Sequence, residues 1–135
     1  MDYRTIPSFP MMITEPTSND VLSGRGKIIN SHPGNVHFRS IVNRLKFEYV
    51  KSQKSDKKVF ANVIVESIRS LNPPGRFLKQ DKETGMWYDI GEKLTLAKTR
   101  QALREGAPVI EKWMEKKRQK QQQQQHEQQQ QQQQQ

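Results

Sequence analysis

The sequence predicts a small α+β domain, and three features of its 135 residues support that prediction. Two short apolar runs flank the polar segment 81–85, which ends in glycine and has the length of a β-hairpin connection. Two segments with helical spacing of apolar residues precede this hairpin, and another follows it. We therefore expect two antiparallel helices, a β-hairpin with segment 21–22 as a candidate third short strand, and a third helix over the hairpin.

The hairpin strands are expected within segments 75–80 and 86–90. Pro73 and Pro74 cannot continue a helix, so they end the segment before them, and Gly75 frees the backbone to turn into the first strand. Trp87 and Tyr88 alternate faces in a regular strand, so one is expected in the core and the other exposed. Upstream, segment 19–30 resembles a short strand interrupted by Gly24 and Gly26.

The first helix is expected to begin at Asn35, a favoured N-cap residue, and to end near Ser52. Its apolar stripe consists of Phe38, Ile41, Val42, Leu45 and Tyr49. The second helix follows the capping pair Ser55 and Asp56, with Phe60, Val63, Ile64, Ser67, Ile68 and Leu71 on its buried side. The third spans residues 92–105, with Leu94, Ala97 and Leu103 (and either Leu96 or Thr99) facing inward, and Gly106 and Pro108 break it.

Composition divides the chain into four parts. Residues 1–18 form a flexible arm, 19–106 the basic domain, 107–120 a basic helical extension and 121–135 a polyglutamine, low-complexity tail. Such a tail is disordered, helical or prone to associate, and the sequence leaves these alternatives open. The arm and the tail add little to a core, so the domain depends on segment 19–106.

Five motifs in order resemble a family of domains of unknown function that is abundant in diatoms. They are Asn19-Asp20-Val21-Leu22-x-Gly24-Arg25-Gly26, His32-Pro33-Gly34-Asn35-x-x-Phe38-Arg39, Pro73-Pro74-Gly75-Arg76-Phe77-Leu78, Trp87-x-Asp89-x-Gly91 and Lys98-Thr99-x-Gln101-Ala102-Leu103-Arg104-Glu105. The resemblance spans residues 19–106 and implies a eukaryotic algal source. It brings no activity, ligand or catalytic residue with it.

Charge and composition narrow the functional classes. The net charge is +9, and segment 19–106 alone holds 17 Lys or Arg against 9 Asp or Glu, so the basic balance belongs to the domain. Zero cysteines exclude disulfides and thiol chemistry. No apolar run has the length of a membrane span, and we expect no membrane partner.

The sequence predicts neither a metal site, a cofactor nor an enzyme. His32 and His37 are too few, and wrongly spaced, to complete a ligand set. The segment from Gly24 to Lys27 suggests a phosphate-binding loop, but it lacks the third glycine of a dinucleotide motif and the spacing of a P-loop. The alternative, a glycine bend between short strands, is the commoner structure.

Nucleic-acid binding, to DNA or RNA, is the main functional prediction. Arginine and glutamine can form paired hydrogen bonds with base edges, while lysine and threonine suit phosphates. The residues expected at this surface lie on the third helix, the glycine loop and the first hairpin strand. They are Arg25, Lys27, Arg76, Lys79, Lys98, Thr99, Arg100, Gln101 and Arg104.

The alternative prediction is a protein-interaction module. In this case the apolar arm and the Trp113 helix dock protein partners, and the glutamines promote association. The basic run from Lys116 to Lys120 fits either a nuclear-import signal or a charged helix end, so we expect a nuclear protein, or otherwise a cytoplasmic one.

Overall fold

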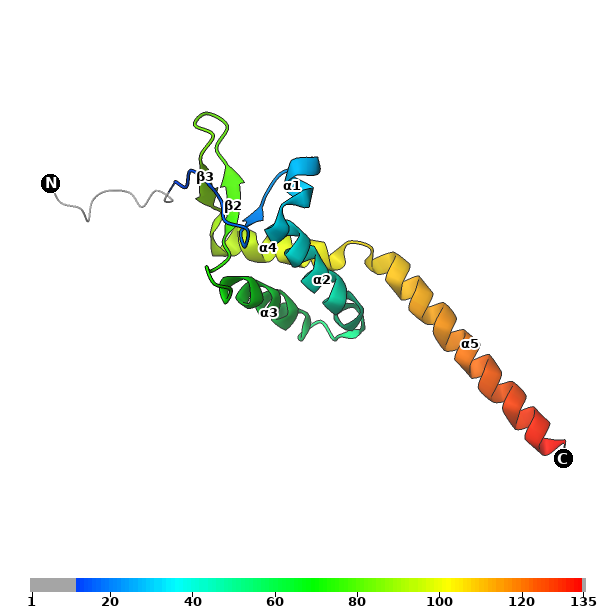
Figure 1. Ribbon diagram of the computed structural model, residues 1–135. Coiled ribbons are helices and arrows are strands. Elements are labelled where there is room, and N and C mark those ends of the chain that lie inside the picture. Colours follow the sequence, from blue (N-terminus) through cyan, green and yellow to red (C-terminus); the bar gives the residue numbers. More distant parts are fainter. Residues whose placement is uncertain (1–11, 135) are drawn as a thin grey trace.

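The computed structural model describes residues 12–134 and confirms the α+β fold (Figure 1). A three-stranded sheet packs beside a cluster of helices, and one long helix extends away from them. In chain order the elements are β1 (Val21–Leu22), α1 (Lys27–Ser31), α2 (Pro33–Lys51), α3 (Lys57–Arg69), β2 (Phe77–Gln80), β3 (Trp87–Asp89), α4 (Gly91–Arg104) and α5 (Ala107–Gln133).

The sheet has the strand order β1-β2-β3 and is mixed. β2 and β3 form the predicted antiparallel hairpin, and β1 is the predicted third strand, parallel to β2 with Val21 opposite Phe77. The free edge of β3 is not left open. Ile13 exchanges two backbone hydrogen bonds of 2.7 Å with Trp87, so the end of the predicted flexible arm is attached to the sheet. Residues 1–11 of that arm lie outside the described residues.

The core lies where α2, α3 and α4 meet the inner face of the sheet. Phe38 of α2 packs edge-to-face on Phe77 of β2, with ring centroids 5.7 Å apart. Tyr49 makes a similar contact with Phe60 across the α2–α3 turn. The third long helix, α4, packs against both α2 and α3. Trp87 and Tyr88 are both half-buried, so the prediction of one core and one exposed ring was wrong.

Two predictions about the N-terminal segment were also wrong. The interrupted strand expected over residues 19–30 pairs only at β1, because Gly24 and Gly26 adopt positive φ angles that turn the chain out of the sheet. Residues 27–31 form the short helix α1, on which Ile28 is 86% exposed. Asn35 does not cap α2, which begins at Pro33. It lies inside the first turn and is buried.

The buried faces of α3 and α4 match the expected ones only in part. On α3, Ile64 and Ile68 are buried as expected, but Ala61 and Val65 join them and Val63 is 49% exposed. On α4 the expected inward positions Leu94 and Ala97 are exposed, whereas Leu103 and the alternative inward position Thr99 are buried. The buried side of α4 is the row Thr95, Thr99 and Leu103, spaced four residues apart. Threonines at these positions let α2 and α3 approach the α4 backbone more closely than leucines would.

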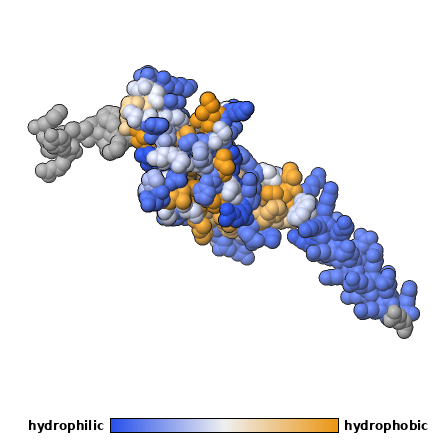
Figure 2. Space-filling model, in the orientation of Figure 1, coloured by the Kyte–Doolittle hydropathy of each residue, from blue (hydrophilic) through white to orange (hydrophobic). Residues whose placement is uncertain are grey.

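The polyglutamine tail is helical, which resolves one of the open alternatives. α5 continues without a break from Ala107 to Gln133, and none of its residues is buried. Trp113, near its start, packs edge-to-face on Phe47 of α2 at 5.6 Å. Figure 2 shows apolar side chains where α5 leaves the domain and a uniformly hydrophilic surface along the rest of that helix. Within residues 12–134, no helix combines the length and hydrophobicity needed to cross a membrane.

Candidate functional site

A hollow of about 340 Å³ lies between the glycine loop that follows β1 and the last two turns of α4. It brings together two stretches that are distant in sequence, residues 21–39 and 98–105. The lining residues are Val21, Leu22, Gly24, Asn30, Asn35, Phe38, Arg39, Lys98, Gln101, Ala102 and Glu105. The hollow is therefore created by the tertiary fold, because no single element supplies more than a part of its wall.

The floor of the hollow is apolar and rigidly held. Val21, Leu22 and Phe38 are core residues. The buried Asn35 amide fixes the floor: its Oδ1 accepts from the Leu22 N–H at 2.7 Å and its Nδ2 donates to the Leu22 carbonyl at 2.8 Å. These bonds satisfy the backbone of β1 on the side away from β2. They prevent that strand edge from pairing elsewhere and hold the glycine loop next to α2.

The rim of the hollow is polar. Lys98 and Gln101 lie three residues apart on one side of α4, and Glu105 follows at the C-cap of that helix. Arg39 faces them from α2 and donates a 2.6 Å hydrogen bond to the Asn30 carbonyl, which ties α1 to α2. Lys98 is half-buried, and its burial lowers the pKa of its ammonium group. The chain thus keeps a cation at the edge of an apolar floor at some cost in desolvation.

The structure brings together some of the predicted site residues. Lys98 and Gln101 line the hollow, whereas Arg25 and Lys27 do not, although they are exposed on the loop whose Gly24 lines it. Arg100 and Arg104 are exposed too, but their positions along α4 place them on a neighbouring, outward side of the helix.

The ion pairs of the domain leave these cations available. Within residues 12–134, the ion pairs join Lys51 to Glu48, Arg69 to Glu92, Arg76 to Asp20 and Arg118 to Glu115. None of these four ion pairs includes a predicted site cation of α4 or of the glycine loop. Apart from the half-buried Lys98, those cations are exposed; they are Arg25, Lys27, Arg100 and Arg104.

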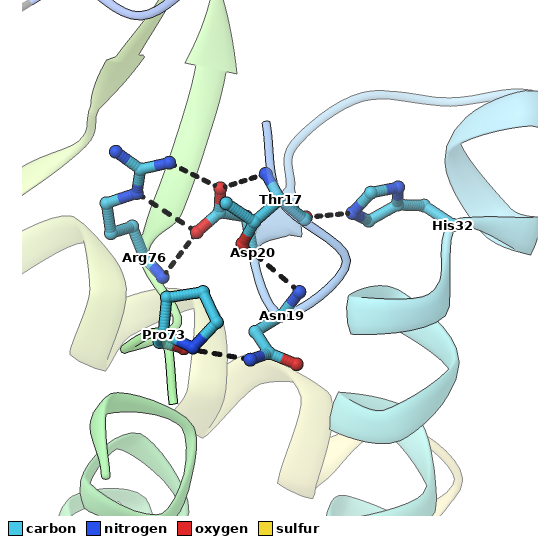
Figure 3. Close-up of polar contacts among 6 residues, drawn as sticks. All are labelled: Thr17, Asn19, Asp20, His32, Pro73 and Arg76. Atoms are coloured by element: carbon cyan, nitrogen blue, oxygen red, sulfur yellow. Dashed lines mark hydrogen bonds and ion pairs between the residues drawn. The ribbon is translucent and has the colours of Figure 1, made fainter. Parts of the chain in front are cut away.

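Arg76 has a structural partner instead of a free guanidinium group (Figure 3). Asp20 is fully buried, and Arg76 donates to its carboxylate from Nε at 3.1 Å, from a terminal nitrogen at 2.7 Å and from its own backbone N–H at 2.9 Å. The Thr17 N–H donates a further bond of 2.8 Å. Burial alone would raise the pKa of the Asp20 carboxyl, but the hydrogen bonds from Arg76 and Thr17 outweigh it, and the pKa lies below its ordinary value.

Two other predicted residues lie outside the hollow. Thr99 is fully buried, and its hydroxyl donates to the Thr95 carbonyl at 2.8 Å, so its expected display on the helix surface was wrong. The error arises from the rotation of α4 about its axis: the side of the helix that carries the threonines faces the core. Lys79 is exposed on β2, opposite Tyr88 in the hairpin, and does not contribute to the lining of the hollow.

Sequence reasoning missed Asn30, Arg39 and Glu105, which line the hollow. Only the spacing of Glu105 from Lys98, seven residues along one helix, could have indicated a shared side. The histidines do not form a site. His32 bonds through Nε2 to the Thr17 carbonyl at 3.0 Å, His37 is exposed, and no cluster of three metal-ligating side chains occurs within residues 12–134.

The comparisons with known proteins agree with the extent of this fold. The family described as "Domain of unknown function (DUF6824)" matches residues 20–105, which is more than half of the chain. No curated protein and no solved structure matches it significantly. The matched residues run from Asp20, the buried partner of Arg76, to Glu105 on the rim of the hollow. The chain belongs to the DUF6824 family of domains of unknown function.

Proposed function

We propose that this domain binds nucleic acid across the hollow between the glycine loop and α4. One observation carries the proposal: Arg39 of α2 and Lys98 of α4, which are distant in sequence, line the same hollow, and the exposed Arg25 and Lys27 follow Gly24, which lines it too. Cations that merely solvate a surface need not converge in this way. The proposed surface consists of Arg39, Lys98 and Gln101 in the hollow, Arg25 and Lys27 on the adjoining glycine loop, and Arg100 and Arg104 on the neighbouring side of α4.

The chemistry of these groups suits a polyanion with bases attached. Exposed Lys and Arg side chains without carboxylate partners can neutralise phosphates and release counterions. Gln101 can both donate to and accept from a base edge. Arg76 and Thr99 are left out, because the first is bound to Asp20 and the second is in the core. Lys79 is left out because it lies on the hairpin, outside this surface.

Fluorescence anisotropy at low salt, with labelled single-stranded and duplex probes of random sequence, tests the proposal. The double substitution Arg25→Ala and Lys27→Ala should weaken binding and reduce the slope of log affinity against log salt by about 1 to 2. The matched control, Lys54→Ala and Lys58→Ala, removes the same charge near the opposite end of α2. Equal losses in both double variants, or no binding by the wild-type chain, would contradict the proposed surface.

A second candidate function rests on a separate groove of about 540 Å³ between α2 and α5. Phe47 and Trp113 line it and are 42% and 48% exposed, respectively, which is unusual for two packed aromatic rings. Lys51, Lys117 and Arg118 surround them, and the Lys117 ammonium lies 4.5 Å from the Trp113 ring centroid. An apolar groove with a basic border is complementary to an acidic amphipathic helix, and we propose that class of partner.

A synthetic acidic amphipathic peptide, titrated while Trp113 fluorescence is followed, tests this second candidate. In the Trp113→Phe variant Trp87 is the remaining tryptophan. A fluorescence change that disappears in this variant arises at Trp113, whereas one that persists reflects a change elsewhere in the domain. Phe47→Ala should weaken peptide binding at least fivefold, whereas the control Val36→Ala, on an exposed part of α2, should not. Absence of peptide binding would contradict this second candidate. Concentration-dependent light scattering that Phe47→Ala abolishes would show that the groove binds a second copy of the chain instead.

A further inference from the structure

We infer that the hollow accepts one unpaired base of a single-stranded nucleic acid. This inference rests on the proposed function and specifies the kind of nucleic acid, because a basic surface alone attracts a duplex and a single strand alike. The form of the hollow distinguishes them. A base in a duplex is stacked and paired, so it enters a lateral hollow only after it leaves the stack, whereas a base in a single strand is already free to do so.

The lining of the hollow matches the two surfaces of a base. Its floor is formed by Val21, Leu22, Phe38 and Ala102, which can pack against the flat apolar face of a heterocycle. Its rim carries donors on Lys98 and Arg39, an acceptor on Glu105 and both kinds of group on Gln101. Base edges present donors and acceptors side by side, and a rim of mixed polarity satisfies both.

Glu105 determines which part of a nucleotide enters the hollow. A phosphate placed between Lys98 and Arg39 would share the hollow with a carboxylate, and like charges at close range are costly in a partly buried site. A neutral base incurs no such repulsion. The phosphates are instead expected outside the hollow, next to the exposed Arg25 and Lys27 of the glycine loop and Arg100 on the neighbouring side of α4.

The size of the hollow is compatible with one inserted base. A volume of about 340 Å³ lies within the range of small-molecule pockets and is large enough to accept a base. Specificity for single strands would then come from one inserted base, with the neighbouring nucleotides contributing mainly phosphate contacts.

The test compares a labelled twelve-nucleotide single strand with a duplex of the same length, each titrated with the full chain at matched ionic strength. We expect at least tenfold tighter binding of the single strand. The variants Lys98→Met and Gln101→Ala should bring the ratio of the two affinities close to one. The control Lys58→Met makes the same change on the exposed side of α3 and should leave the ratio unchanged.

Two further arms identify the group inside the hollow. If a phosphate occupies it, Glu105→Gln should strengthen binding more than the matched neutralisation Glu111→Gln on α5, and this would overturn the inference. A mononucleotide that binds as tightly as the twelve-nucleotide strand would also overturn it, because the site would then serve free nucleotides.

The failure of this inference differs from the failure of the proposed function. Equal affinity for both probes, with loss of binding in the Arg25→Ala and Lys27→Ala variant, would overturn the single-base site and retain nucleic-acid binding. No affinity for either probe would overturn both.

Discussion

At the scale of single residues, the Asp20–Arg76 pair has the largest structural effect. It connects the segment before β1 to the start of β2, fifty-six positions later, and it buries a carboxylate completely. A buried ion pair is a weak net stabiliser, but loss of one partner leaves an uncompensated charge. We expect Arg76→Met to lower the free energy of unfolding by about 3 kcal/mol in urea denaturation, and an effect below about 1 kcal/mol would contradict this role.

The same carboxylate predicts a pH dependence. The pKa of Asp20 in the folded chain lies below its ordinary value of 3.8, so the carboxylate stabilises the fold above that value. This stabilisation disappears as the pH falls through the lowered pKa and the group becomes protonated. The difference in unfolding free energy between the wild type and Asp20→Asn should therefore be constant near neutral pH and shrink below about 3.8. A difference that stays constant down to pH 2 would contradict it.

Thr95 and Thr99 form a matched pair on the buried side of α4. The Thr99 hydroxyl has a hydrogen-bond partner, whereas the buried Thr95 hydroxyl has none within residues 12–134. A buried hydroxyl without a partner pays its desolvation cost in full. Thr95→Val should raise the free energy of unfolding by about 1 kcal/mol, and Thr99→Val should not. Thermal and urea denaturation of both isosteric variants would show the difference, and equal responses would be contrary evidence.

At the scale of elements, the contact between α2 and the β1 segment positions the hollow. Gly34, in the first turn of α2, has the Asp20 backbone where a Cβ atom would project, so the helix can approach only because a side chain is missing. Gly34→Ala should cost about 3 kcal/mol of stability and weaken binding at the hollow, since α2 must move away from β1. Ser40→Ala, on the exposed side of α2, serves as the control for both measurements and should change neither.

The long helix α5 is a separate case among the elements. It has no buried residue, and its main described attachment is the Phe47–Trp113 contact. Glutamine has good intrinsic helix propensity, and side-chain contacts four residues apart, such as Gln123 with Glu127, add local support. We therefore expect α5 to remain helical without contacts to the core, and the core to fold without α5.

Removal of residues 107–135 tests this independence. The loss of one half-exposed aromatic contact amounts to about 1 kcal/mol, so the shortened chain should keep a cooperative thermal transition within a few degrees of the wild type. Circular dichroism would follow both the helix content and the transition. A chain that unfolds on truncation would show that α5 is part of the core.

At the scale of the whole molecule, two groups of cations have different consequences. One group is Lys98 at the hollow with Arg25 and Lys27 on the adjoining glycine loop, and the other lies along α5 from Lys116 to Lys120. The first group is fixed by the packed domain, whereas the second belongs to an exposed helix. A polyanion that contacts both groups would bind with a steeper salt dependence than the domain alone.

A structural feature could be predicted from the sequence when the interactions that determine it join residues close together along the chain. The hairpin, the helix-ending prolines and the three helical segments depend on neighbouring residues, and all of them occur in the structure. The helix faces were less predictable. α4 contains few large apolar residues, so its orientation depends on the space that α2 and α3 leave, and Thr95 and Thr99 fill that space better than Leu94.

The candidate site was predictable only in part for the same reason. The basic character of the glycine loop and of α4 is visible in the sequence, but the partner of Arg76 is fifty-six residues away and its pairing removes it from the surface. Asn30 and Arg39 gave no local signal, because a residue on a helix becomes part of a site only when another segment faces it.

The amino-acid sequence by itself determined the local elements and their order, because backbone preference, amphipathic spacing and chain-breaking residues act within a few positions. The tertiary structure alone decided which side of α4 is buried, that Asn35 holds the β1 backbone instead of capping a helix, and that Lys98 meets the glycine loop across a hollow. Those outcomes depend on packing volume and on hydrogen-bond partners that lie far away along the chain.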